Sequence, residues 1–200
     1  FTFSKKLGQN FIVNPSICPR IAELGGAGPD TGVLEIGPGI GVLTKELSAV
    51  CGRVAAVELD RRLPDVLAET LADCPNVQVV PGDVLQMDLQ ALFADQFAGC
   101  DRLQVCANLP YYITTPVLMR LLESELPIER LVVMVQLEAA KRLCAPLGTR
   151  DCGAVSAAVE YYTQAEILFE VGRESFFPSP NVDSAVIALT RRQQPPVQSV

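Results

Sequence analysis

Histidine is absent from this sequence of 200 residues, and its absence excludes a large class of catalysts. Neither a histidine-containing nucleophilic triad nor a histidine general base can operate in such a chain. No metal site is expected either, because histidine is absent; in addition, the seven cysteines are scattered and none of them forms a C-x-x-C pair. Their odd number and scattered placement predict free core thiols in a reducing compartment, the cytoplasm.

Long apolar runs and a leader sequence are missing as well. No stretch approaches the roughly 20 apolar residues that a membrane span requires. Residues 1–6, with the sequence FTFSKK, lack the apolar segment of a signal peptide. We therefore expect no membrane partner, and the missing initiator methionine indicates a trimmed chain or a fragment.

Positive charge is scarce, with 16 basic against 23 acidic residues and a net charge of −7. This balance argues against nucleic-acid binding through overall electrostatics. An RNA partner would have to meet a basic segment outside this sequence or a local basic patch. The visible candidates are the pairs Lys5-Lys6, Arg61-Arg62 and Arg191-Arg192, each of which could equally be a solvated surface pair.

What the sequence does contain is enough apolar material, 49% of residues, for one domain with a sizeable core. Apolar runs predict strands at 33–36, 53–58, 77–81, 102–107 and 130–136, with two closing strands at 165–171 and 183–190. Helices are expected to begin near residues 14, 42, 114, 137 and 153. Strands that alternate with helices predict an α/β fold with a doubly wound, mostly parallel seven-stranded sheet and helices on both faces.

The strand at 33–36 ends in a glycine-dense turn, residues 37–41, that precedes a helix. Such a turn lets a ligand approach the backbone closely beyond the carboxyl ends of parallel strands. A dinucleotide fingerprint would need glycine where Val42 stands, and Pro38 has no amide hydrogen to offer a phosphate. The pattern E-x-G-x-G-x-G, starting at Glu35, is instead similar to motif I of the Rossmann-like class I methyltransferases, which bind S-adenosyl-L-methionine. A strand-to-helix turn without a ligand is the alternative.

Acidic residues end the next two strands. Glu58 lies 21 residues after Gly37, near the offset of a ribose-binding carboxylate. Asp83 ends the following strand at the same edge of the sheet, where it could meet the exocyclic amino group of adenine. The alternatives are a surface acid for Glu58 and a turn-capping aspartate for Asp83.

The tetrapeptide Asn108-Leu109-Pro110-Tyr111 indicates methyl transfer to the amino group of adenine. The lone pair of that nitrogen is delocalised into the ring, so a site can help by accepting both amino protons and aiming the lone pair at the methyl carbon. The Asn108 side-chain oxygen and the Leu109 carbonyl are two such acceptors, and this alignment needs no strong base. Tyr111 and Phe176 could stack on the two faces of a base taken from its stack, although core packing is the alternative.

Together these stretches resemble one family, the KsgA-like ribosomal RNA adenine N6-dimethyltransferases, which are similar to the Erm resistance methyltransferases. The matching segments are 7–11 (LGQNF), 34–39 (LEIGPG), 58–60 (ELD), 82–83 (GD), 108–111 (NLPY) and 176–184 (F-x-P-x-P-x-V-x-S). The resemblance implies that S-adenosyl-L-methionine is bound by Asn10, Ile12, Gly37, Gly39, Glu58, Asp83 and Asn108. It also implies a catalytic set around the target adenine, namely Asn108, Leu109, Tyr111 and Phe176.

The implied reaction is dimethylation of adjacent adenosines in small-subunit ribosomal RNA, on an immature 30S-type subunit, by a cytoplasmic monomer. Residues 1–192 would form the catalytic domain with residues 1–13 as an N-terminal arm, and 193–200 would lead toward a helical C-terminal domain that the family carries. The sequence departs from the family at Tyr112, Thr114 and Leu137, where Asn, Ser and an RNA-contacting Lys are usual. We expect weak RNA binding by this chain alone.

Three other functions stay open at this stage. One is a large-subunit ribosomal RNA methyltransferase that confers antibiotic resistance. A second is a ribosome-assembly protein that keeps the fold without catalysis, although Glu58, Asp83 and Asn108 are intact. A third, more distant, is a nicotinamide oxidoreductase, which Val42 opposes.

Overall fold

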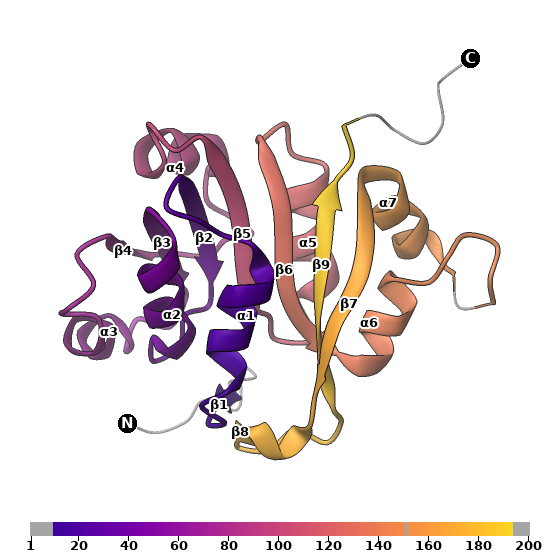
Figure 1. Ribbon diagram of the computed structural model, residues 1–200, viewed down its shortest axis with the longest axis horizontal. Coiled ribbons are helices and arrows are strands. Elements are labelled where there is room, and N and C mark those ends of the chain that lie inside the picture. The colour runs from indigo at the N-terminus through magenta and orange to yellow at the C-terminus, as the bar shows by residue number, and fades with distance from the viewer. Residues whose placement is uncertain (1–9, 151, 194–200) are drawn as a thin grey trace.

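The computed structural model describes residues 10–150 and 152–193, in which a mixed sheet is covered by helices on both faces (Figure 1). The sheet has seven strands in the order β4-β3-β2-β5-β6-β9-β7. Strand β9 is antiparallel to both of its neighbours, and the strands from β4 to β6 are parallel. The predicted fold class, that of the class I methyltransferases, is therefore confirmed.

The strands follow the apolar runs of the sequence. They are β2 (Thr31–Ile36), β3 (Arg53–Glu58), β4 (Val77–Pro81), β5 (Arg102–Asn108), β6 (Ile128–Gln136), β7 (Thr163–Val171) and β9 (Ser184–Arg191). Every residue of β2 is buried, as expected for a central parallel strand with both faces covered. Its successive residues Val33 and Leu34 belong to the two separate core clusters on opposite faces of the sheet.

The helices divide between these two faces. One face carries α1 (Ile17–Gly25) and α2 (Val42–Val50), which lie in front of the sheet in Figure 1. The other face carries α4 (Leu89–Gln96), α5 (Thr114–Leu122), α6 (Leu137–Leu143) and α7 (Ala154–Tyr162). Helix α3 (Pro64–Thr70) packs beside β4, and a short 3₁₀ turn, η2 (Arg173–Ser175), follows β7. No helix within the described residues is long and apolar enough to cross a membrane.

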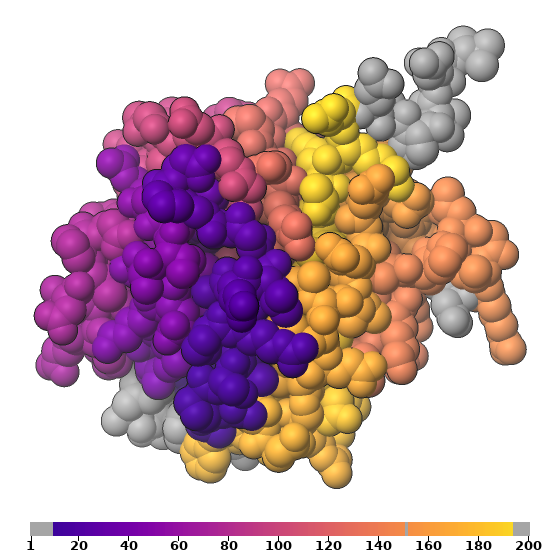
Figure 2. All heavy atoms as spheres, in the orientation of Figure 1, coloured from indigo at the N-terminus to yellow at the C-terminus, as the bar shows by residue number. Residues whose placement is uncertain are grey.

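The main difference from the sequence expectation is a second, two-stranded sheet. Residues 11–12, expected as a loop or arm, form β1 (Phe11–Ile12), which pairs antiparallel with β8 (Phe176–Phe177). Figure 2 shows the indigo N-terminal segment lying against the orange segment at the lower edge of the molecule. The Lys5-Lys6 pair, most of the 7–11 motif and residues 194–200 lie outside the described residues.

Candidate active site

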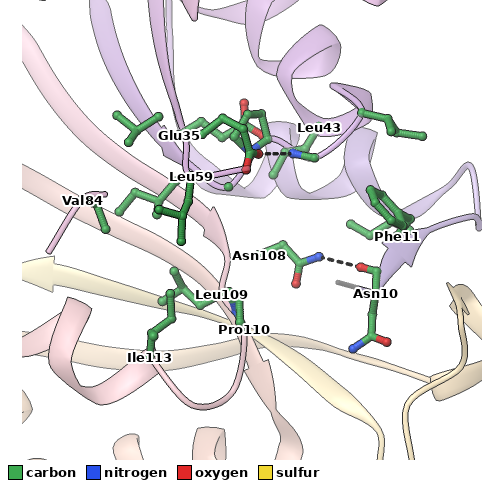
Figure 3. Close-up of a pocket in the computed structure, with 18 of the residues that line it drawn as sticks. Asn10, Phe11, Glu35, Leu43, Leu59, Val84, Asn108, Leu109, Pro110 and Ile113 are labelled. Atoms are coloured by element: carbon green, nitrogen blue, oxygen red, sulfur yellow. Dashed lines mark hydrogen bonds between the residues drawn. The ribbon is translucent and has the colours of Figure 1, made fainter. Parts of the chain in front are cut away.

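A pocket lies at the carboxyl ends of strands β2 to β5, with β1 and β8 beside it. The turn after β2, the ends of β3 and β4 and the loop after β5 form its walls (Figure 3). The structure brings all of the residues predicted for the site into its lining: Asn10, Ile12, Gly37, Gly39, Glu58, Asp83, Asn108, Leu109, Tyr111 and Phe176. Their individual roles in binding and catalysis remain predictions.

The glycine turn owes its shape to backbone conformations that other residues rarely adopt. Gly37 and Gly39 have φ angles of 72° and 60°, in the left-handed region. A Cβ added at Gly39 would also lie 3.2 Å from Cε1 of Phe11, so the ring of Phe11 packs directly over this glycine. The turn thus has no side chain at Gly37 and Gly39, and the ring of Phe11 occupies the space beside Gly39.

Glu58 fixes this turn to the end of β3. Its Oε2 accepts a hydrogen bond from the Gly39 amide at 3.3 Å, and its Oε1 accepts one from the Asp60 amide at 2.7 Å. The residue is only 6% exposed, so the surface-acid alternative is wrong. Burial raises the pKa of Glu58, while the backbone hydrogen bonds from Asp60 and Gly39 act in the opposite direction.

Asp83 shapes the loop that follows β4. Its Oδ1 accepts a hydrogen bond from the Leu85 amide at 2.9 Å, and its carbonyl accepts bonds from the amides of Gln86 and Met87. Asp83 therefore caps the turn, as the alternative predicted, and it also lines the pocket. The two uses are compatible, because a carboxylate offers two acceptor oxygens.

Asn108, the last residue of β5, is oriented by the arm. Its Nδ2 donates to the main-chain carbonyl of Asn10 at 3.5 Å, and Figure 3 shows the side-chain oxygen turned away from that contact. An acceptor oxygen is thus held in the pocket wall beside Leu109. The family resemblance implied that Asn10 and Asn108 share one site, but nothing in the sequence indicated the hydrogen bond between the Asn108 side chain and the Asn10 carbonyl.

The two aromatic residues that were predicted to stack on the target base, Tyr111 and Phe176, both line the pocket. The Tyr111 hydroxyl shares a hydrogen bond of 3.3 Å with the hydroxyl of Ser184, a buried residue at the start of β9. Phe176 is 4% exposed and packs in the core as well as lining the pocket, so the core-packing alternative is correct and its stacking on a base stays a prediction. Tyr112, in contrast, lies at the rim with 59% of its surface exposed. Sequence reasoning missed the role of Ser184, whose signal was its place in the 176–184 segment.

Glu35 is the most unusual residue of the pocket wall. It is 1% exposed, and its Oε2 has no hydrogen-bond partner among the described residues. Burial raises the pKa of Glu35 to about 8; the side chain of Thr44 acts in the opposite direction, and the charge of Glu58 adds to the rise. A buried acid without a partner is costly, which indicates that a ligand group with hydrogen-bond donors belongs beside it.

Three arginines of the predicted basic pairs form ion pairs or hydrogen bonds within the fold. Arg62 forms an ion pair with Asp60 at 2.6 Å. Arg191 donates to main-chain carbonyls just after α5, and Arg192 forms an ion pair with Glu160 of α7. Arg191 and Arg192 are therefore not free surface cations, whereas Arg61 and Arg62 are both exposed, as the surface-pair alternative expects. The pair at 191–192 is structural, which neither sequence alternative foresaw.

Comparisons with known proteins agree with this geometry. The family described as ribosomal RNA adenine dimethylase matches residues 1–200. The ribosomal RNA small subunit methyltransferase A of Geobacillus thermodenitrificans is 50% identical over 197 residues, which cover 98% of this chain and 67% of the relative. That of Bacillus licheniformis is 47% identical over 98% of this chain and 68% of the relative. The chain thus spans about two thirds of the length of these curated relatives.

Solved structures of related methyltransferases also match this chain. The 23S rRNA methyltransferase ErmE matches with a TM-score of 0.81 and 32% identity, over 95% of this chain and 73% of that protein. A dimethyladenosine transferase from Plasmodium falciparum matches with a TM-score of 0.80 and 26% identity, over 92% of this chain and 64% of that protein. The chain therefore belongs to the ribosomal RNA adenine dimethylase family, whose members are S-adenosylmethionine-dependent methyltransferases.

Proposed function

We propose that this chain is the catalytic part of an enzyme that dimethylates adjacent adenosines in small-subunit ribosomal RNA. The orientation of Asn108 carries the proposal: its amide nitrogen is bound to the Asn10 carbonyl, so its oxygen is held as an acceptor in the pocket. The 50% identity with a small-subunit methyltransferase favours that RNA over the large-subunit RNA on which ErmE acts. We place the enzyme in the cytoplasm as a monomer that works during ribosome maturation.

The pocket fits S-adenosylmethionine. The unpartnered Oε2 of Glu35 calls for a cationic donor, and the methionine part of the cofactor carries an ammonium group. Glu58 and Asp83, at successive strand ends, suit the ribose hydroxyls and the adenine amino group. The proposed binding set is Asn10, Ile12, Gly37, Gly39, Glu58, Asp83 and Asn108. When bound, the cofactor supplies an electrophilic methyl group on its sulfonium.

The catalytic part of the proposal concerns alignment. The Asn108 side-chain oxygen and the Leu109 carbonyl accept the two amino protons of the target adenine. The nitrogen lone pair then turns out of conjugation with the ring and toward the methyl carbon. Tyr111 and Phe176 hold the two faces of the base, and the hydrogen bond with Ser184 fixes the tilt of the Tyr111 ring.

Methyl incorporation from radiolabelled cofactor, catalysed by a form of the protein extended to the relatives' length, tests the proposed function. We expect incorporation into immature small subunits as dimethyladenosine, with none into large-subunit RNA. Incorporation into large-subunit RNA alone would instead assign a resistance methyltransferase. Cofactor binding without incorporation into either RNA would assign an assembly protein that lacks catalysis.

Loss of either strand-end acid is expected to weaken cofactor binding. Asp83→Ala and Glu58→Ala each remove a charge-assisted hydrogen bond worth about 1.5–3 kcal/mol, or roughly tenfold or more in affinity. Calorimetric titration with S-adenosylmethionine measures the effect. Asp88→Ala is the matched control, because Asp88 caps α4 through the Ala91 amide, 3.0 Å from Oδ1, and is not a pocket residue. Equal affinities for Asp83→Ala and Asp88→Ala would contradict the assignment.

The domain boundaries lead to a second expected result. We propose that residues 1–192 form the catalytic domain, with residues 1–13 as its arm, and that 193–200 link it to a further RNA-binding domain. This chain should then bind cofactor with near-normal affinity but bind RNA weakly, because Arg62, Arg191 and Arg192 have internal partners. Filter binding at several salt concentrations compares it with a form extended to the relatives' length. The extended form should show a steeper salt slope, by about 0.7–0.9 for each added phosphate contact. Equal slopes would place the RNA site within these 200 residues.

A further inference from the structure

Arg120 lies on a helix that contacts two loops of the pocket, the loop after β4 and the loop after β5. It lies on α5 and is partly buried, with its guanidinium directed at the loop between β4 and α4. Its Nη1 donates to the carbonyl of Leu85, and its Nη2 donates to the carbonyl of Met87 at 2.5 Å. Within residues 10–150 and 152–193 no carboxylate forms an ion pair with it. Its charge is therefore directed at two main-chain acceptors.

The loop that Arg120 holds is the loop that carries Asp83. Asp83 accepts the Leu85 amide at its carboxylate and the Met87 amide at its carbonyl, so the amides of both residues face Asp83. The carbonyls of the same two residues face Arg120. The loop is thus held between an acid that lines the pocket and a cation behind it. A shift of the guanidinium would move the peptide units on which the position of Asp83 depends.

The other end of α5 carries the target-base loop. The Ile113 amide donates to the Pro110 carbonyl at 3.1 Å, and the Thr114 hydroxyl donates to the same carbonyl at 3.3 Å. The helix therefore starts directly from the Asn108–Tyr111 tetrapeptide. Arg120 lies between one and two turns further along the same rigid element. One helix thereby fixes the distance between the target-base loop and the Asp83 loop.

We propose that Arg120 is a positioning residue: it holds the Asp83 loop in the position in which Asp83 contacts the adenine of the cofactor. This inference rests on the proposed function, because it assumes that Asp83 contacts the cofactor. Arg120 itself does not line the pocket, so it acts through the loop and not by contact with a ligand. A guanidinium suits this task because its planar fork donates to two acceptors at once, which an ammonium does less well.

The test compares Arg120→Met with Arg191→Met. Arg191 also uses its guanidinium to hold main-chain carbonyls, those of Leu122 at the C-terminal end of α5 and of Ser124 and Leu126 just after it. Both variants should lower the unfolding temperature. Only Arg120→Met should raise the dissociation constant for S-adenosylmethionine, by about tenfold, with Arg120→Lys in between. Turnover at saturating cofactor should fall much less than the affinity does.

A double-mutant comparison shows whether Arg120 acts through Asp83. In the Asp83→Ala background, Arg120→Met should change the cofactor dissociation constant by less than about twofold, because the contact that it positions is already absent. An unchanged dissociation constant in Arg120→Met, an equal change in Arg191→Met, or fully additive effects with Asp83→Ala would overturn the inference. Failure of the wild-type chain to bind the cofactor would instead count against the proposed function itself.

Discussion

Asn108→Ala is expected to lower the turnover number by about 10²–10³-fold, the loss typical of a preorganised group that acts in the transition state. The affinity for S-adenosylmethionine should change by less than about tenfold. The physical reason is that the Asn108 oxygen is fixed before the base arrives, since its amide nitrogen is held by the Asn10 carbonyl. Steady-state methyl incorporation into immature small subunits by the extended form, at saturating cofactor, measures the first quantity, and calorimetry measures the second.

Asn76→Ala is the matched control for this experiment. The Asn76 amide also donates to main-chain carbonyls, those of Ser48 and Cys51, each at 3.0 Å, but Asn76 does not line the pocket. Its loss should cost stability and leave the turnover of the folded enzyme near that of the wild type. A comparable loss of turnover in both variants, or normal turnover in Asn108→Ala, would show that Asn108 does not align the amino group.

Glu35→Gln is expected to make the chain more stable at alkaline pH in the absence of cofactor. The pKa of Glu35 is raised in the fold from its ordinary value of 4.5 to about 8, chiefly by burial. Between these values the unfolded chain has released the proton while the folded chain still holds it. The stability that comes from this protonated carboxyl is therefore complete below pH 4.5 and is lost as the pH rises to about 8. Glutamine does not ionise and avoids the loss.

The size of this effect has an upper limit. The interval from 4.5 to about 8 corresponds to at most about 5 kcal/mol, at about 1.4 kcal/mol for each tenfold change in the ionisation constant. Urea unfolding at a series of pH values gives the difference between wild type and variant. Glu23→Gln, on the exposed side of α1, changes the same charge without burial and should leave the profile unaltered. If the wild type and Glu35→Gln keep a constant difference across this range, Glu35 is already ionised in the fold.

The sequence predicted the sheet and most of the pocket for one physical reason. Parallel strands present their carboxyl ends at one edge, so residues that end successive strands must meet there. Glu58, Asp83 and Asn108 needed only correct strand assignment to be placed together, and the strands at 53–58 and 77–81 match the structure residue for residue. The glycines at positions 37 and 39 predicted the turn after β2, which forms another wall of the pocket.

The features that escaped prediction are long-range contacts without a local pattern. Strands β1 and β8 have two residues each, too few for any periodicity, and they exist only because they pair with each other beside the pocket. Arg120 and Arg191 look like ordinary helix and strand cations until the fold brings main-chain carbonyls to them. Tertiary packing decides such pairings, and a single sequence carries no signal for them.

The pairing of β1 with β8 has a consequence for how the protein is made. Phe11 pairs with Phe177, so 166 residues must be synthesised after the first partner before the second exists. At about 5–20 residues per second, translation leaves the arm without its partner strand for on the order of ten to thirty seconds. During that time the parallel strands β4 to β6 can pair, but β7 has no partner because β9 is made after β8. The wall of the pocket that β1 and β8 form is also still missing. The cofactor site is therefore among the last parts of the proposed catalytic domain to form.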